Sequence, residues 1–387
     1  MKKHLLLCLF ATMTMGSVFT SCSDDDEKDA PVVCPIEKTT FNGSNGLELT
    51  YGGEALLGKQ VVFTPNVADH TKATLTLSGA ALSIEGLPIT LPGAGVVPGE
   101  KTTVLEVENI VTNGDAISFE GVNETENRVV KFNGTANKSG LKLNLDVVMA
   151  SNILSGKTFN LVPMTQKPTA LHLNWVADEF KFSGGTWDIQ SAILMTVGLF
   201  PVVDGMNALE ALAAVLKNVS FLEDGNIVAE YKDQPKDENW KTSPVNLATY
   251  TVQDNKIKLF LNPEQIIYIA TKASKSSRAS IAELIPALLE KAGSLLENGI
   301  TLHIGENEGA TTFYLDMEEL MPILQMVKPL FQDEEIIKML VELIAEAAGP
   351  DMAPLVQLFV PDILVALPIV IDTTKELQIG LNFTEAE

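Results

Sequence analysis

Basic residues are scarce in this 387-residue chain. It has 27 lysines and arginines against 50 aspartates and glutamates, a formal net charge of −23 at pH 7. A protein that binds nucleic acid needs clustered lysine and arginine to contact the phosphates. The shortage of basic residues therefore excludes nucleic acid as a partner. The same negative charge repels anionic lipid headgroups, so any attachment to a membrane needs another source.

Cysteine is also rare, with three residues in the whole chain. Cys8 and Cys22 belong to the first 22 residues, and Cys34 stands between Val33 and Pro35. So few cysteines exclude a fold that depends on a disulfide framework. Because the neighbours of Cys34 are apolar and no histidine is near it in the sequence, we expect a buried thiol rather than a nucleophile.

Motifs for catalysis or cofactor binding are missing. His70, His172 and His303 lie far apart in the sequence, without the close spacings that build a metal site. No Gly-x-Ser-x-Gly stretch marks a hydrolase nucleophile. Residues 155–158 resemble the end of a phosphate loop but lack its first glycine. We therefore assign no catalytic residue, metal ligand or cofactor, and expect no enzyme. A pocket that combined a histidine with two carboxylates would reopen that question.

The start of the chain, in contrast, carries a specific signal. A basic start, an apolar run, two small residues and a cysteine follow one another: Lys2 and Lys3, residues 5–10, Thr20 and Ser21, and Cys22. This order is typical of a bacterial lipoprotein signal peptide, and the apolar run is too short for a membrane span. We expect cleavage between Ser21 and Cys22, which removes residues 1–21, and attachment of acyl chains such as palmitate to a diacylglyceryl Cys22.

Three further segments follow the predicted cleavage site. Residues 22–33 are small, acidic or proline, which predicts a flexible tether. Residues 34–149 contain short β-rich runs separated by turn signals, so we expect an all-β antiparallel barrel or sandwich. Residues 150–387 add amphipathic helices to further strands, which predicts a second β domain with helical insertions. The predicted fold class is therefore α+β.

Cap signals indicate where the helices of the second region begin. Asn207 with Glu210, Ser280 with Glu283, and Asp316 with Glu319 each place a capping residue three positions before a glutamate. Because negative charge at a helix start favours the helix dipole, capping accounts for these acidic residues without a catalytic role. The apolar stretch 355–371 contains prolines at intervals of seven, which argues against a membrane-spanning helix.

Apolar residues of the predicted helices support two interpretations. Together with the methionines they form either a core that packs the helices onto the sheet or the lining of a cavity for an apolar ligand. The candidate ligand-binding residues under the second interpretation are Met321, Leu324, Met339, Leu343, Leu358 and Phe359.

Two stretches resemble a known group of proteins. The Ser21-Cys22 junction with the acidic run 24–27 resembles the surface-export lipoprotein leader of Bacteroidota. Residues 221–226 and 250–259 are similar to the strand pattern of uncharacterised calycin-like (lipocalin-like) surface lipoproteins of those bacteria. The resemblance implies display on the outside of the outer membrane through the lipid anchor. It implies no activity, because that family has none established.

The sequence thus predicts a lipid-anchored outer-membrane protein that is not an enzyme and that binds a ligand or a partner protein. The leading hypothesis is an apolar small ligand between a β-barrel and the helices. The alternative is a glycan-binding or assembly subunit of a surface nutrient-uptake complex, with a transporter as partner.

Overall fold

The structure of the protein is a computed structural model that describes residues 33–83, 90–182, 184–203, 205–273, 293 and 295–386. Within the chain, Cys34–Glu387 form one compact unit. Ser21, Cys22, nearly all of the predicted tether and most of the helix predicted from Ser280 lie outside the described residues.

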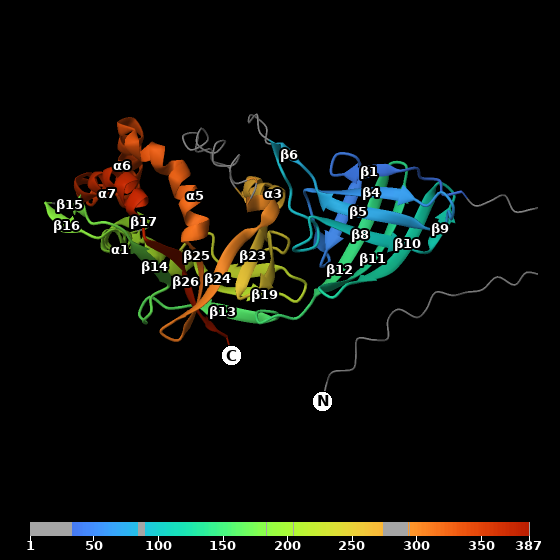
Figure 1. Ribbon diagram of the computed structural model, residues 1–387, viewed down its shortest axis with the longest axis horizontal. Coiled ribbons are helices and arrows are strands. Elements are labelled where there is room, and N and C mark those ends of the chain that lie inside the picture. The colour runs from blue at the N-terminus through green and yellow to red at the C-terminus, as the bar shows by residue number, and fades with distance from the viewer. Residues whose placement is uncertain are drawn as a thin grey trace, which may run out of the picture. The chain divides into compact units, whose positions relative to one another are not determined.

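The first β region consists of two main sheets (Figure 1). The four-stranded sheet has the order β1-β4-β5-β8, formed by Thr39–Asn42, Lys59–Pro65, Ala73–Gly79 and Thr102–Val107. The six-stranded sheet has the order β3-β2-β12-β11-β10-β9, formed by Glu54–Ala55, Leu47–Tyr51, Gly140–Met149, Arg128–Asn137, Ala116–Glu124 and Ile110–Asn113. A small separate hairpin pairs β6 (Leu82–Ser83) with β7 (Thr90–Leu91). The predicted β-rich region is confirmed, although β2 and β12 pair in parallel.

One hydrophobic core lies between the two sheets. Burial alternates along β11 and β12, so that every second side chain is buried and the others face solvent. The four-stranded sheet contributes Phe63 and Leu75 to this core, and the six-stranded sheet contributes Phe132 and Leu143. Cys34 belongs to the same core and is buried, as predicted.

Lys59 is an unusual inward-facing residue of β4. Its side chain is buried, and Nζ donates a hydrogen bond of 2.8 Å to the carbonyl oxygen of Ala94. Burial lowers the pKa of Lys59 from its ordinary 10.5 to about 8, although the Glu264 carboxylate acts in the opposite direction. Between pH 8 and pH 10.5 the Lys59 side chain is mostly protonated in the unfolded chain and mostly neutral in the folded chain. The Lys59 contribution to the free energy of unfolding therefore rises with pH in this range.

We therefore expect the free energy of unfolding of the natural protein to rise relative to that of Lys59→Met between pH 7.5 and 9.5. The expected gain is about 2 kcal/mol, since methionine has the same shape without a titrating charge. Urea denaturation of both proteins across this pH range measures the difference. If the free energies of unfolding of the two proteins changed in parallel with pH, Lys59 would have the same pKa in the folded and unfolded states.

The second β region contains a ten-stranded sheet. Its order is β21-β20-β19-β13-β26-β25-β24-β23-β22, with β14 also paired to β26. The strands in chain order are β13 (Lys157–Leu161), β14 (Leu171–Val176), β19 (Leu216–Phe221), β20 (Ile227–Tyr231), β21 (Lys241–Thr242), β22 (Ala248–Gln253), β23 (Lys256–Leu261), β24 (Ile300–Asn307), β25 (Ala310–Asp316) and β26 (Glu376–Glu385). Two short hairpins are separate from it, β15 (Phe180–Phe182) with β16 (Gly185–Trp187) and β17 (Pro201–Val203) with β18 (Met206–Asn207).

This sheet curls, and its core is aromatic. An isolated antiparallel bridge joins Asn226, just before β20, to Thr249 in β22, so strands far apart in the sheet order meet. The Phe221 ring contacts the rings of Phe159, Phe313 and Tyr250 at centroid distances of 5.8, 5.4 and 4.9 Å. Such edge-to-face contacts add to the stabilisation from burial.

Helices follow the strands at several points. They are α1 (Ile189–Leu199), α2 (Ala208–Val215), α3 (Pro263–Ala273), α5 (Met317–Val327), α6 (Glu334–Ala348) and α7 (Ala353–Thr373), with a 3-10 helix η1 (Lys328–Gln332). Asn207 and Glu210 form the predicted capping box at the start of α2. Asp316 caps α5, and Asp333 caps α6. The α+β prediction is confirmed at this level.

Helix α7 runs through Pro361 and Pro368, two of the prolines that recur at intervals of seven. Among the helices that the structure describes, α7 is long and apolar enough to cross a membrane by length and composition. However, Val356, Val360 and Val370 are buried in the protein. One face of α7 therefore belongs to the core, while 33% of its most apolar stretch is buried in the protein.

Asn246 links the second β region to the first. Its side chain is buried, and Nδ2 lies within hydrogen-bonding distance of the carbonyl oxygens of Tyr51, Glu54 and Ala55 at 3.1, 3.3 and 3.2 Å. Its backbone N–H donates to Asn226 Oδ1 at 2.7 Å. This one residue therefore satisfies several polar groups of the β2–β3 turn.

Candidate functional site

The helices α1, α5, α6 and α7 pack into two hydrophobic cores. One core joins α1, α5 and α7 to strands β14, β15 and β26, and it includes Ala192, Leu320 and Ile363. The other joins α6 to α7. The Phe359 side chain packs against both cores, and its ring lies 5.7 Å from that of Phe182. The packing interpretation of the apolar helices thus holds for their inward-facing residues.

The six candidate ligand-binding residues divide into two groups. Met321, Leu324 and Phe359 are partly buried and pack against the first helical core. Met339, Leu343 and Leu358 lie on the surface, with 40, 44 and 62% of their area exposed. The structure thus places three of them in the interior and three on the outside of α6 and α7.

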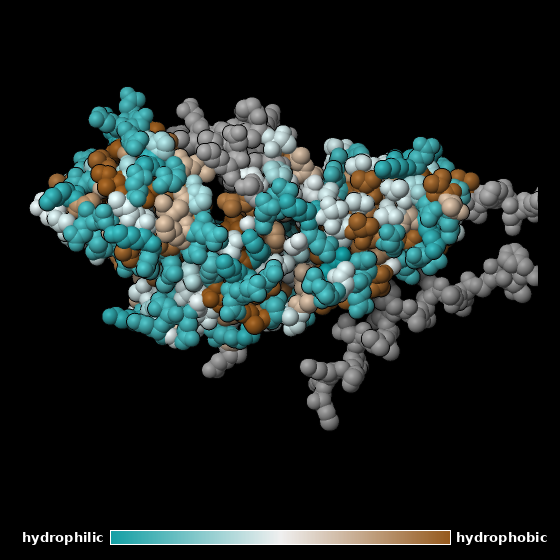
Figure 2. Space-filling view, in the orientation of Figure 1, coloured by the Kyte–Doolittle hydropathy of each residue, from teal (hydrophilic) through white to brown (hydrophobic). Residues whose placement is uncertain are grey.

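The exposed apolar residues of α7 continue along the helix. Val365 and Ile369 are 58 and 64% exposed, and they follow Leu358 at seven and eleven positions, close to two and three helical turns. Figure 2 shows hydrophobic surface among hydrophilic surface over α6 and α7. We call Met339, Leu343, Leu358, Val365 and Ile369 the helical apolar surface. It is the part of the predicted apolar site that a ligand can reach.

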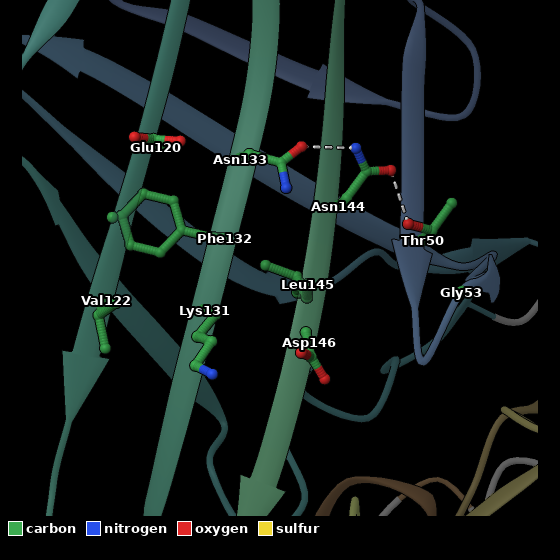
Figure 3. Close-up of a pocket in the computed structure, with 11 residues that line it drawn as sticks. Thr50, Gly53, Glu120, Val122, Lys131, Phe132, Asn133, Asn144, Leu145 and Asp146 are labelled. Carbon is green, nitrogen blue, oxygen red and sulfur yellow. Dashed lines mark hydrogen bonds between the residues drawn. The ribbon is translucent and has the colours of Figure 1, made fainter. Parts of the chain in front are cut away.

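A polar groove lies on the outer face of the six-stranded sheet (Figure 3). Its volume is about 620 Å³, and carboxylates, amides, a lysine and a hydroxyl line it. Asn144 Nδ2 donates to Asn133 Oδ1 at 2.9 Å, while Asn144 Oδ1 accepts from Thr50 Oγ1 at 2.8 Å. This ladder holds the Asn144 amide in place across three strands.

One group of described residues could hold a metal ion, and it consists of His303, Asp316 and Glu319. His303 Nε2 lies 2.9 Å from Asp316 Oδ2 and 3.5 Å from Glu319 Oε2. Burial and the nearby Asp316 carboxylate raise the pKa of Glu319. The site brings together a histidine and two carboxylates, the combination that would reopen the question of catalysis.

Sequence spacing did not reveal this cluster. Asp316 and Glu319 were interpreted only as capping residues, and His303 as an isolated strand histidine. The turn at Glu308-Gly309 could have revealed it. If the strands on either side of this turn form a hairpin, His303 lies opposite Tyr314, and Asp316 lies two residues further along the same strand. Register across a hairpin thus carries information that spacing along the chain does not.

Comparison found no matching family model, no matching curated protein and no matching solved structure. The calycin-like resemblance therefore stays a prediction from residues 221–226 and 250–259. The functional argument has to come from the surfaces and side chains described above.

Proposed function

We propose that the protein is a lipid-anchored outer-membrane protein, displayed at the cell surface, that binds a neutral apolar ligand at the helical apolar surface. The signal-peptide pattern ending at Cys22 supports the anchor, and the acidic run after it supports surface display. The curled antiparallel sheet is compatible with the calycin-like resemblance, in which a β-barrel and its attached elements hold the ligand.

The observation that carries the binding proposal is the exposure of Leu358, Val365 and Ile369 on α7. Burying apolar area is favourable by about 25 cal/mol per Å², so exposed apolar side chains along one helix offer affinity to an apolar molecule. Segment 334–373 contains seven acidic residues and one lysine, which disfavours anionic ligands. A neutral lipid or another neutral apolar molecule fits both properties.

The double substitution Leu358→Ser, Val365→Ser is expected to weaken binding of a neutral fluorescent monoacylglycerol about tenfold, since it removes two apolar contacts. Because both side chains are exposed, the fold should tolerate the change. Fluorescence titration of the purified lipoprotein in detergent-free nanodiscs measures the affinity.

A matched control is Val111→Ser, Val148→Ser in the first β region, where the two valines are 64 and 50% exposed. It should bind like the natural protein. No binding by the natural protein, or equal loss in both double variants, would contradict the proposal.

The polar groove favours the alternative function, a glycan-binding or assembly subunit of a nutrient-uptake complex. Its amides and carboxylates are suited to hydrogen bonds with the hydroxyl groups of a sugar. If the natural protein bound a neutral oligosaccharide and the Asn144→Ala variant did not, the groove rather than the helical apolar surface would be the principal binding site. Recovery of a transporter by cross-linking through groove residues would support the assembly role.

A further inference from the structure

We propose that His303, Asp316 and Glu319 bind a divalent transition-metal ion such as Zn²⁺. One imidazole and two carboxylates are ligands that Zn²⁺ accepts in proteins. A nitrogen ligand disfavours Ca²⁺ and Mg²⁺, which prefer sites made wholly of oxygen. This site is distinct from the helical apolar surface and the polar groove.

Local structure brings the three side chains together. His303 in β24 pairs with Tyr314 in β25, and Asp316 lies two residues further along β25, so its side chain points to the same face of the sheet. Helix α5 begins directly after Asp316, and Glu319 lies in its first turn. A hairpin register and a helix start therefore aim three ligands at one point.

The two carboxylate oxygens of Asp316 have different partners. Its Oδ1 accepts the backbone N–H of Glu318 at 2.8 Å and caps α5, which leaves Oδ2 to face His303. The cap fixes the carboxylate before any ion arrives. A carboxylate held by its other oxygen is already oriented, as metal ligands in proteins usually are.

One of the two measured distances matches a coordination sphere, and the other is shorter. Ligand atoms bound to tetrahedral Zn²⁺ at 2.0 to 2.2 Å lie roughly 3.3 to 3.6 Å apart. Here the Nε2–Oε2 distance is 3.5 Å, and the Nε2–Oδ2 distance is 2.9 Å. All three ligand atoms lie within 4.8 Å of one another. A shift of a few tenths of an ångström would complete the geometry.

Unused hydrogen-bonding capacity points to a missing ligand. His303 Nε2 and Glu319 Oε2 are buried, and neither makes a hydrogen bond of good geometry, although Nε2 lies 2.9 Å from Asp316 Oδ2 and 3.5 Å from Glu319 Oε2. Their side chains are only 15 and 13% exposed. A buried polar atom without a partner is costly, and coordination to a cation would satisfy both atoms.

Aromatic packing holds the imidazole in place. The Tyr314 ring stacks on His303 with centroids 5.2 Å apart and an interplanar angle of 24°, and His172 lies on Tyr314 at 5.6 Å. Gly380 pairs with both Tyr314 and His172, and a Cβ there would come within 2.6 Å of Tyr314 Cα and Cβ. A glycine at this position therefore lets β26 approach the backbone of β25 beside Tyr314.

Three protein ligands leave at least one coordination position for water or an external ligand, which is the arrangement of exchangeable or catalytic rather than closed structural metal sites. We therefore expect reversible binding of one ion per chain. The metal site is independent of the apolar-ligand site, so a negative result for one leaves the other unaffected.

Competition against a chromophoric Zn²⁺ chelator, in excess Mg²⁺ to saturate the acidic surface, tests the site in the purified full-length lipoprotein. We expect one Zn²⁺ per chain and a loss of affinity of about 100-fold or more in His303→Gln and in Glu319→Gln. The absorption spectrum of bound Co²⁺ should show nitrogen and oxygen ligands and vanish in both variants.

His70→Gln is the matched control, since it changes a histidine of the first β region that lies outside the triad, and it should keep the ion. Circular dichroism of each variant verifies folding, and Glu319→Gln is nearly isosteric. Absence of Zn²⁺ binding by the natural protein would overturn the proposal. So would unchanged affinity in folded His303→Gln and Glu319→Gln.

Discussion

Replacing Cys22 with serine is expected to remove the acyl chains and release the protein from the membrane fraction. Only a thiol forms the thioether to diacylglycerol, so the serine variant has no anchor. Each buried methylene of an acyl chain contributes about 0.8 kcal/mol, and two or more chains hold a protein stably. Since the rest of the chain is strongly acidic, electrostatic attraction to the membrane cannot compensate.

Metabolic labelling with a palmitate analogue, followed by membrane sedimentation, measures both effects. Cys34→Ser is the control, because that thiol is buried in the first β region and should leave labelling and sedimentation unchanged. If the Cys22→Ser protein were still labelled and still sedimented with membranes, the anchor would lie elsewhere. In a separate experiment, protease treatment of intact cells shows whether the anchored natural protein is displayed on the outside.

Asn246→Ala is expected to lower the free energy of unfolding by about 4 kcal/mol. The substitution removes the donor to the buried carbonyl oxygen of Tyr51 and to the part-buried carbonyl oxygens of Glu54 and Ala55, and an unsatisfied buried group costs about 1 to 3 kcal/mol. Asn246 also has a φ of 67°, a left-handed conformation that costs alanine about 1 kcal/mol more than asparagine.

Asn255→Ala separates these two contributions. Asn255 has a φ of 58° but is exposed in the turn before β23, so its substitution reports the backbone cost alone. Urea denaturation of both variants should show a much larger loss for Asn246→Ala, about 3 kcal/mol beyond the control. Equal losses would mean that the buried amide adds nothing to stability.

Local patterns predicted much of the fold. Alternation of apolar and polar residues located the strands of the first β region, because one face of each strand is buried. Capping residues located the starts of α2 and α5, since a helix start needs acceptors for its free N–H groups.

Other features depend on contacts that the sequence pattern does not show. The apolar stretch with prolines at intervals of seven did not predict that α7 would continue through Pro361 and Pro368, with its buried face packed on the cores. Strand β26 was missed, although Leu377, Ile379 and Leu381 alternate with polar residues or glycine. The His303 cluster was missed because pairing between β24 and β25, rather than spacing, assembles it.

Strand β26 supplies the last residues of the chain, yet it lies in the interior of the ten-stranded sheet between β25 on one side and β13 and β14 on the other. Because β26 follows all three of its partner strands in the chain, this sheet cannot close until β26 has been synthesised, and until then those three strands expose unpaired backbone.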